Sequence, residues 1–104
     1  MINIKDYARV YVEQLHNKNQ FIISYRDKDN KSLLAFQSYR TLIAIYDLKD
    51  DNLYLNWSKW DYSKTTLKHL KMFINEYLYT FSYENKQQFI NCIKNNPKII
   101  LFEE

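Results

Sequence analysis

The chain has 104 residues, of which 46% are hydrophobic and 26% are charged, and it carries a formal net charge of +3 at pH 7. This length fits one domain, expected to span residues 1–104, and the apolar share excludes a globally disordered chain. Glycine is absent, which excludes a Walker A loop, a dinucleotide-binding fingerprint and a G-x-S-x-G nucleophile elbow, because each needs glycine where the backbone turns sharply or approaches a ligand.

The residue usage also indicates where such a protein works. The chain has 12 Lys, 11 Asn, 11 Ile and 10 Tyr, all encoded by A/T-rich codons, as in a low-GC bacterium or its phages. A single cysteine, Cys92, excludes an internal disulfide and suits a reducing compartment. The sequence has neither a signal-peptide core nor an apolar run long enough to span a membrane. We therefore expect a soluble protein in the bacterial cytoplasm, without membrane contact.

A helix is the first predicted element, over residues 3–18. Its apolar side chains recur at the i, i+3, i+4, i+7 spacing of one helical face, namely Ile4, Tyr7, Ala8, Tyr11, Val12 and Leu15. A strand is the competing interpretation, because Val10 and Val12 are β-branched.

Four strand-like runs follow, over residues 20–26, 32–39, 41–47 and 53–57. They are rich in Ile, Leu, Phe and Tyr, and polar clusters separate them. The pairs Asp29-Asn30 and Asp51-Asn52 are candidate hairpin tips, because both residue types tolerate turn conformations. These runs predict an antiparallel meander, with the doubly apolar run 41–47 at its centre.

Two helices and one strand complete the prediction. The helix over residues 64–79 has Asp61 or Ser63 as its N-cap, and the helix over residues 83–95 has Ser82. A last strand covers residues 98–102. The fold class is therefore α+β, with the order α-β-β-β-β-α-α-β and an antiparallel sheet of four to five strands that has helices packed on one face.

The chemistry-bearing residues form no catalytic or metal-binding pattern, so we expect no enzyme, metal or cofactor. His69 has no second ligand residue at metal spacing and is expected at a boundary or on the surface. An enzyme would need a cleft that joins His69 with Asp61 and Thr65.

A cluster of basic and aromatic residues is the main functional candidate. Lys64, Lys68 and Lys71 recur at i, i+4, i+7, on the helix face opposite the apolar stripe. Together with Lys59, Trp57 and Trp60 they suit phosphates and stacked bases. The alternative is a solvated helix face with both tryptophans in the core.

A second candidate surface consists of tyrosines in the strand-like runs. Helices can hardly cover both sheet faces, so some of these side chains should be exposed and suited to a protein interface. The alternative is ordinary half-exposed strand tyrosine. The residues are Tyr25, Tyr39, Tyr46 and Tyr54.

One resemblance extends these observations. The segments SYRTLIAIYD, LYLN and WDYSKTTLKHLKMFI, within residues 38–74, resemble an uncharacterised family of small proteins carried by phages, prophages and plasmids of low-GC bacteria. The residues that match its recurring pattern are Asp61, Tyr62, Ser63, Thr65, Thr66, Lys68 and His69. The resemblance implies a non-enzymatic inhibitor of a host defence protein, of the anti-CRISPR type. Separately, we expect a monomer or a homodimer.

The sequence thus supports two hypotheses. In the first, the chain binds and inhibits a host defence effector such as a CRISPR nuclease. In the second, it is a small nucleic-acid-binding accessory protein of a mobile element. The predicted partner-binding residues are Trp57, Lys59, Trp60, Lys64, Lys68, His69 and Lys71.

Overall fold

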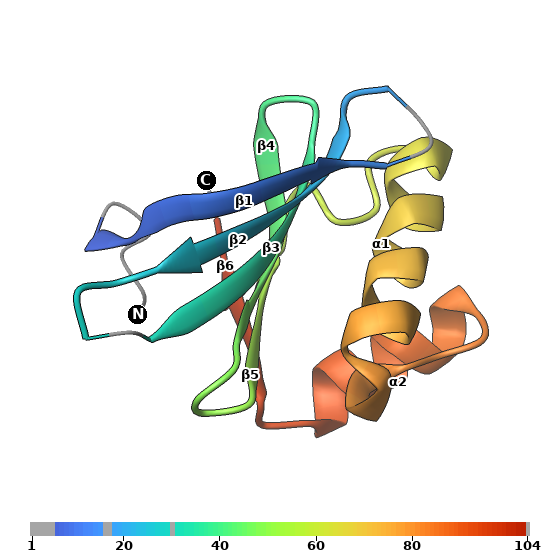
Figure 1. Cartoon of the computed structure of the whole chain (residues 1–104). Coiled ribbons are helices and arrows are strands. Elements are labelled where there is room, and N and C mark those ends of the chain that lie inside the picture. Colours follow the sequence, from blue (N-terminus) through green and yellow to red (C-terminus); the bar gives the residue numbers. More distant parts are fainter. Residues whose placement is uncertain (1–5, 16–17, 30, 104) are drawn as a thin grey trace.

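One six-stranded sheet organises the chain (Figure 1). The computed structural model describes residues 6–15, 18–29 and 31–103. In the sheet the strands lie in chain order, and the first five form an antiparallel meander. The strands are β1 (Ala8–Gln14), β2 (Gln20–Arg26), β3 (Ser32–Ser38), β4 (Thr41–Asp47), β5 (Asn52–Asn56) and β6 (Ile99–Phe102).

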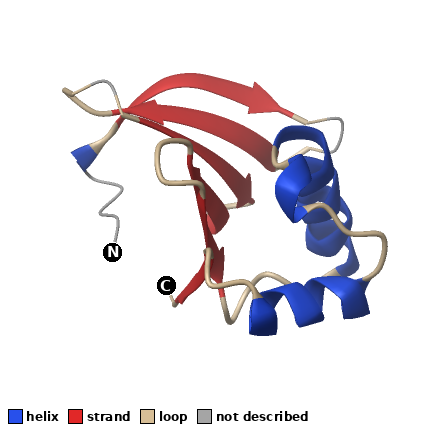
Figure 2. Cartoon of the chain, turned by 90° about the horizontal axis from the view of Figure 1, so that it is seen from below, coloured by secondary structure: helices blue, strands red, loops and turns tan. Residues whose placement is uncertain are grey.

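The last strand pairs with β5 in parallel. A parallel pair needs a crossover connection, and here the crossover contains α1 (Lys64–Tyr77), the 3₁₀ turn η2 (Tyr79–Phe81) and α2 (Lys86–Asn95). Both helices lie on the same face of the sheet (Figures 1 and 2). The α+β class is confirmed, but the sheet has six strands and is mixed rather than antiparallel.

The predicted first helix is wrong from residue 8 to residue 14, which form the edge strand β1, and the competing interpretation as a strand is confirmed there. A β-bulge at Val10 explains the misleading periodicity. Ala8 pairs with Arg26 and Tyr11 with Ser24, so the extra residue places Ala8 and Tyr11 on the same sheet face although they are three positions apart. This spacing imitates the i, i+3 step of a helix. Residues 3–5 and 16–17 of the predicted helix lie outside the described residues.

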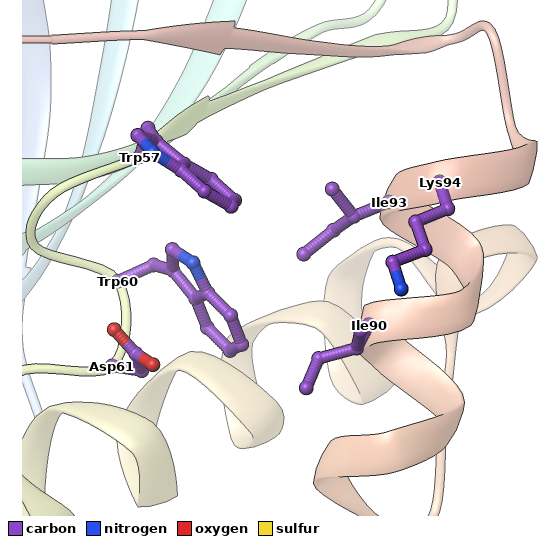
Figure 3. Close-up of a pocket in the computed structure, with 6 residues that line it drawn as sticks. All are labelled: Trp57, Trp60, Asp61, Ile90, Ile93 and Lys94. Atoms are coloured by element: carbon purple, nitrogen blue, oxygen red, sulfur yellow. The ribbon is translucent and has the colours of Figure 1, made fainter.

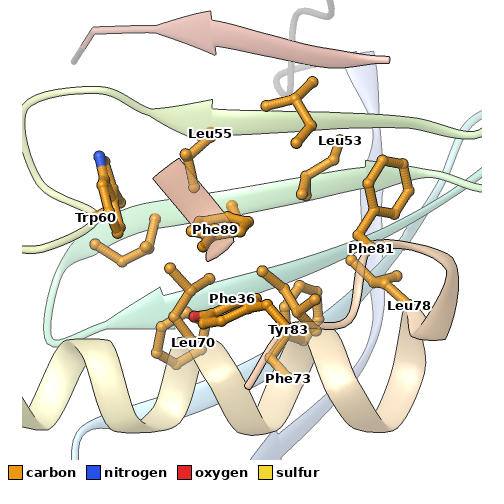
Figure 4. Close-up of a cluster of buried hydrophobic side chains, with 14 of the residues drawn as sticks. Phe36, Leu53, Leu55, Trp60, Leu70, Phe73, Leu78, Phe81, Tyr83 and Phe89 are labelled. Atoms are coloured by element: carbon orange, nitrogen blue, oxygen red, sulfur yellow. The ribbon is translucent and has the colours of Figure 1, made fainter. Parts of the chain in front are cut away.

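The main core fills the space between the helices and the sheet (Figure 4). Leu70, Phe73 and Ile74 form the buried stripe of α1, as its periodicity predicts. Phe73 stacks on Phe36 of β3 with ring centroids 5.9 Å apart. Burial of each such side chain contributes roughly 1.5–3 kcal/mol, which outweighs the repulsion among the lysines of α1, roughly 0.2–0.5 kcal/mol per pair.

A second, smaller cluster lies on the other sheet face. The bulge at Val10 and a second irregularity between Phe36 and Gln37, where β3 pairs with β4, bend the sheet, and Figure 2 shows its curvature. Tyr7 packs against this second cluster. Its buried members are Ile23, Tyr25, Leu33, Ala35, Leu42, Ile45, Tyr54 and Phe102.

The helix starts follow from local hydrogen bonds. Ser63, one of the two predicted caps, caps α1, because its Oγ accepts a hydrogen bond from the Thr66 N–H at 3.1 Å. The cap of α2 is Asn85, whose side chain accepts from the Gln88 N–H at 3.0 Å. Ser82 is therefore not the cap, and α2 begins later than predicted because the Asn75 amide holds both the N–H (3.0 Å) and the C=O (2.9 Å) of Tyr83.

Turns occur without glycine, as the sequence requires. Asn19, Tyr39 and Asp51 take positive φ values of 70°, 56° and 56°. Asp51 confirms the predicted hairpin tip between β4 and β5, whereas Asn30 lies outside the described residues. Within the described ranges, no helix has the length and apolar character needed to cross a membrane.

Candidate functional site

A pocket opens where the connection from β5 to α1 meets α2 (Figure 3). Its volume is about 360 Å³. The walls are mainly apolar, and a carboxylate and an amine stand among them. The lining residues are Trp57, Trp60, Asp61, Ile90, Ile93 and Lys94.

The backbone after β5 positions both tryptophans. The carbonyl of Asn56 accepts hydrogen bonds from the N–H groups of Lys59 (3.2 Å) and Trp60 (3.0 Å) and closes a turn. The buried Asn56 side chain donates to the Leu42 carbonyl at 2.9 Å, which fixes this turn on the sheet. Trp57 lies at the end of the strand, where its backbone N–H donates a hydrogen bond to the Phe102 carbonyl at 2.8 Å.

The two tryptophans consequently have different roles. Trp60 is 4% exposed and packs edge-on against Phe89 of α2, with ring centroids 5.3 Å apart and planes at 77°. Trp57 is 50% exposed. The predicted partner contact of Trp60 is therefore limited to the pocket that it lines. Trp60 belongs to the core and forms the pocket wall, because the turn at Asn56 directs it inward, and Trp57 is the accessible aromatic.

Charged groups surround the pocket. The Nζ of Lys86 lies 3.3 Å from the Asp61 carboxylate and 5.7 Å from the centroid of the Trp60 ring. Asp61 thus already has a cationic neighbour. Lys94 and Lys59 are exposed, and neither forms an ion pair within the described part of the chain. Glu103 is exposed and follows Phe102, whose carbonyl accepts the backbone N–H of Trp57, so it places a negative charge beside that residue. Lys59, Lys86 and Lys94 against Asp61 and Glu103 leave the surroundings of the pocket with an excess of one positive charge.

The three lysines predicted on the outer face of α1 are not all exposed. Lys64 and Lys68 are exposed on α1. Lys71 is half-buried, and its Nζ donates a hydrogen bond to the Glu84 carbonyl at 2.6 Å. Lys71 therefore ties α1 to the segment before α2, while the other two lysines remain available.

His69 is buried, with 3% of its surface exposed, so its prediction as a surface or boundary contact residue is wrong. Its Nδ1 lies 2.8 Å from the Thr65 carbonyl one turn earlier in α1. His69 does not line the pocket that Asp61 lines. The pocket therefore does not join His69 with Asp61 and Thr65 as the enzyme alternative requires.

Other motif residues also have structural positions. The Thr66 hydroxyl is buried and lies 3.1 Å from the Ser38 hydroxyl of β3 and 3.0 Å from the cap hydroxyl of Ser63. These contacts fasten the first turn of α1 to the sheet. Much of the WDYSKTTLKHL motif therefore builds the start of α1, and its surface contribution comes from Asp61, Tyr62, Lys64 and Lys68.

The four tyrosines do not share one exposed sheet face. Tyr25 and Tyr54 are 5% and 8% exposed, because both pack in the second cluster. Tyr46 lies on the helix-facing side, half-buried, and its hydroxyl donates to the Asp51 carboxylate at 2.6 Å. Burial, followed by this hydrogen bond, raises the pKa of Tyr46 to about 12. Tyr39 alone among the four is exposed, at the turn after β3.

The sequence prediction missed the α2 side of the pocket. Ile90 and Ile93 are half-buried, pack against the main core and line the pocket together with Lys94. The sequence signal for this wall is that Ile90 and Ile93 lie one turn apart near the end of a short helix and that Lys94 follows Ile93. Within the described ranges, no three His, Cys, Asp or Glu side chains gather as a metal site would require.

Comparison with known proteins gives a family without an assigned activity. No curated protein and no solved structure matches the chain. Residues 3–91 match the model of a family described as a family of unknown function, DUF8033. This match includes most of the sheet, all of α1 and the turn that carries both tryptophans. The chain therefore belongs to the DUF8033 family.

Proposed function

We propose that this protein is a non-enzymatic binding protein that inhibits a bacterial host defence effector, of the CRISPR nuclease class, through the surface around Trp57. The observation that carries this proposal is a half-exposed tryptophan on the wall of an apolar pocket. Tryptophan at the edge of a pocket is typical of binding hot spots, because a partner that covers it removes a large apolar surface from water.

The choice of a host defence partner rests on the resemblance of residues 38–74 to small phage and prophage proteins. The A/T-rich residue usage agrees with such a source. The positive excess around the pocket suits an acidic surface on the effector rather than the mimicry of DNA by an acidic inhibitor.

The test uses the full chain with purified CRISPR nucleases, measuring co-elution on size exclusion and loss of target cleavage. We expect one effector to co-elute and to lose activity, and Trp57→Ala to remove both effects. Tyr79→Ala is the matched control, because Tyr79 is an exposed aromatic beyond the far end of α1. Neither co-elution nor inhibition across the nucleases tested would contradict the proposal.

A nucleic-acid-binding role is the second candidate. Lys59, Lys64 and Lys68 are exposed and follow Trp57 closely in the sequence, as does the exposed Tyr62, and this combination of cations and accessible aromatic rings suits a single strand. In that case the affinity falls steeply with salt and falls further in the Lys64→Glu, Lys68→Glu double variant. Binding that is absent or insensitive to salt excludes this role.

A further inference from the structure

The pocket between Trp57 and α2 also indicates what kind of ligand it takes. We infer that it receives one large apolar side chain, aromatic or branched aliphatic, presented by an acidic segment of a partner protein. This inference rests on the proposed binding function and specifies the partner's chemistry at the same site.

The pocket walls favour an apolar side chain. Trp57, Ile90 and Ile93 direct apolar groups toward the space between the β5–α1 connection and α2 (Figure 3). The volume of about 360 Å³ lies at the small end of ligand pockets, roughly 300–1,000 Å³. This volume accommodates a large apolar side chain such as that of phenylalanine.

The same walls disfavour a nucleobase. A base has hydrogen-bonding groups along its edges, and burial leaves them unsatisfied unless the pocket supplies partners. The charged lining groups are Asp61 and Lys94, and the Asp61 carboxylate is already 3.3 Å from the Lys86 amine. This leaves the Lys94 amine as the charged donor of the lining, against the several polar groups on the edge of a base. An apolar side chain has no such requirement.

The surrounding charges select the segment that carries the anchor. Lys86 offsets Asp61, and Glu103, which follows the Phe102 carbonyl bonded to the Trp57 backbone N–H, offsets one further amine. Lys94 on α2 and Lys59 on the turn between the two tryptophans therefore leave an excess of one positive charge. These exposed amines stand on the two elements that form the pocket. Carboxylates on either side of the anchor would meet them, whereas basic residues there would be repelled.

The test is a titration of the full isotope-labelled chain, followed through the indole N–H signals of Trp57 and Trp60. The probes are the peptides Ac-Asp-Glu-Phe-Glu-Asp-NH2, its Phe→Ala analogue, Ac-Lys-Lys-Phe-Lys-Lys-NH2 and a ten-nucleotide oligo-dT. We expect the acidic phenylalanine peptide to shift the Trp57 signal and to bind roughly ten-fold or more tightly than the other probes.

Two variants test the contribution of the apolar contact and that of the surrounding charges separately. Trp57→Ala should abolish binding of the acidic phenylalanine peptide, and a retained amide spectrum would show that the variant is folded. The Lys59→Glu, Lys94→Glu double variant should reverse the preference, so that the basic peptide binds better. Lys49→Glu is the matched control, since Lys49 is exposed in the β4–β5 turn away from the pocket, and it should leave the preference unchanged.

Several results would overturn the inference. If the alanine peptide binds as tightly as the phenylalanine peptide, the pocket does not select an apolar side chain. If the basic peptide binds as tightly, the surrounding charges do not select an acidic segment. Tighter binding of oligo-dT favours a nucleic-acid ligand instead. A chain that inhibits a nuclease but binds none of the peptides keeps the proposed function and overturns this inference. A chain that binds the acidic phenylalanine peptide but no effector supports this inference and contradicts the proposed function.

Discussion

Tyr39 has an unusual backbone conformation for a bulky residue. Its φ of 56° lies in the left-handed region, which costs an L-residue roughly 1–2 kcal/mol. Ser38 pairs with Thr41, so Tyr39 and Arg40 form a two-residue connection between β3 and β4. Glycine is preferred at the first position of such a turn when φ is positive there.

We therefore expect Tyr39→Gly to raise the free energy of unfolding by about 0.5–1 kcal/mol, measured by urea denaturation. Arg40→Gly is the control, because Tyr39, and not Arg40, has a positive φ, and it should lower stability by roughly 0.5–1 kcal/mol. If both variants lose stability equally, the Tyr39 side chain contributes contacts that outweigh its backbone strain.

Tyr46 makes stability depend on alkaline pH. Burial and the hydrogen bond to Asp51 raise its pKa from 10.0 to about 12 in the folded chain. The folded state therefore holds this proton more tightly than the unfolded state. Its contribution to stability is complete below pH 10 and is lost as the pH rises from about 10 through 12.

We expect the free energy of unfolding, measured in urea at a series of pH values, to fall over this range. Burial also raises the pKa values of Tyr7, Tyr54, Tyr77 and Tyr83, which act in the same direction. Tyr46→Phe should make the decline shallower. An unchanged pH dependence in Tyr46→Phe would show that the other tyrosines account for it.

At the scale of the elements, the start of α2 gives a direct comparison between two candidate caps. Asn85 accepts a hydrogen bond from Gln88 N–H, whereas Ser82 follows the 3₁₀ turn and caps no helix. Asn85→Ala should therefore cost about 1 kcal/mol of unfolding free energy, and Ser82→Ala only a few tenths. Thermal and urea unfolding measure both. A larger loss in Ser82→Ala would show that α2 starts earlier in solution.

Most elements after β1 could be predicted from the sequence, because hydrophobic runs and polar separators mark them clearly. The range of β2 and that of β4 agree with the predicted ones. The first strand was only the competing interpretation of its segment, because the bulge at Val10 depends on pairing with β2, a contact that the local periodicity does not contain. The parallel partner of β5 likewise follows from the path of the crossover, not from the pattern within β6.

The candidate site was predicted in part. The sequence located the aromatic and basic segment, but it could not assign Trp57 to the surface and Trp60 to the core. That distinction depends on the turn at Asn56 and on the contact of Trp60 with Phe89, which is distant in sequence. His69 was placed wrongly, because the side of α1 that carries it meets the sheet.

At the scale of the whole molecule, β6 couples the two sides of the sheet. Ile99 belongs to the main core and Phe102 to the second cluster. Phe102→Ala should cost about 3–5 kcal/mol, because it leaves a cavity in a buried cluster. Leu101→Ala, at an exposed position of the same strand, should cost roughly 1 kcal/mol or less.

The coupling predicts a single unfolding transition in the Phe102→Ala variant as well. Far-ultraviolet circular dichroism follows the backbone and tryptophan fluorescence follows the pocket region. We expect both signals to change at the same, lower urea concentration. Separate midpoints would show that the helix layer and the second cluster unfold independently.

The hydrogen bond from the Trp57 backbone N–H to the Phe102 carbonyl, at 2.8 Å, has a practical consequence for fusion proteins. Any tag or reporter joined shortly after Phe102 begins directly beside the exposed tryptophan. A bulky C-terminal fusion would compete with a partner for that space, and a pull-down made with it would miss binding that the same chain shows when the fusion is moved to the other terminus.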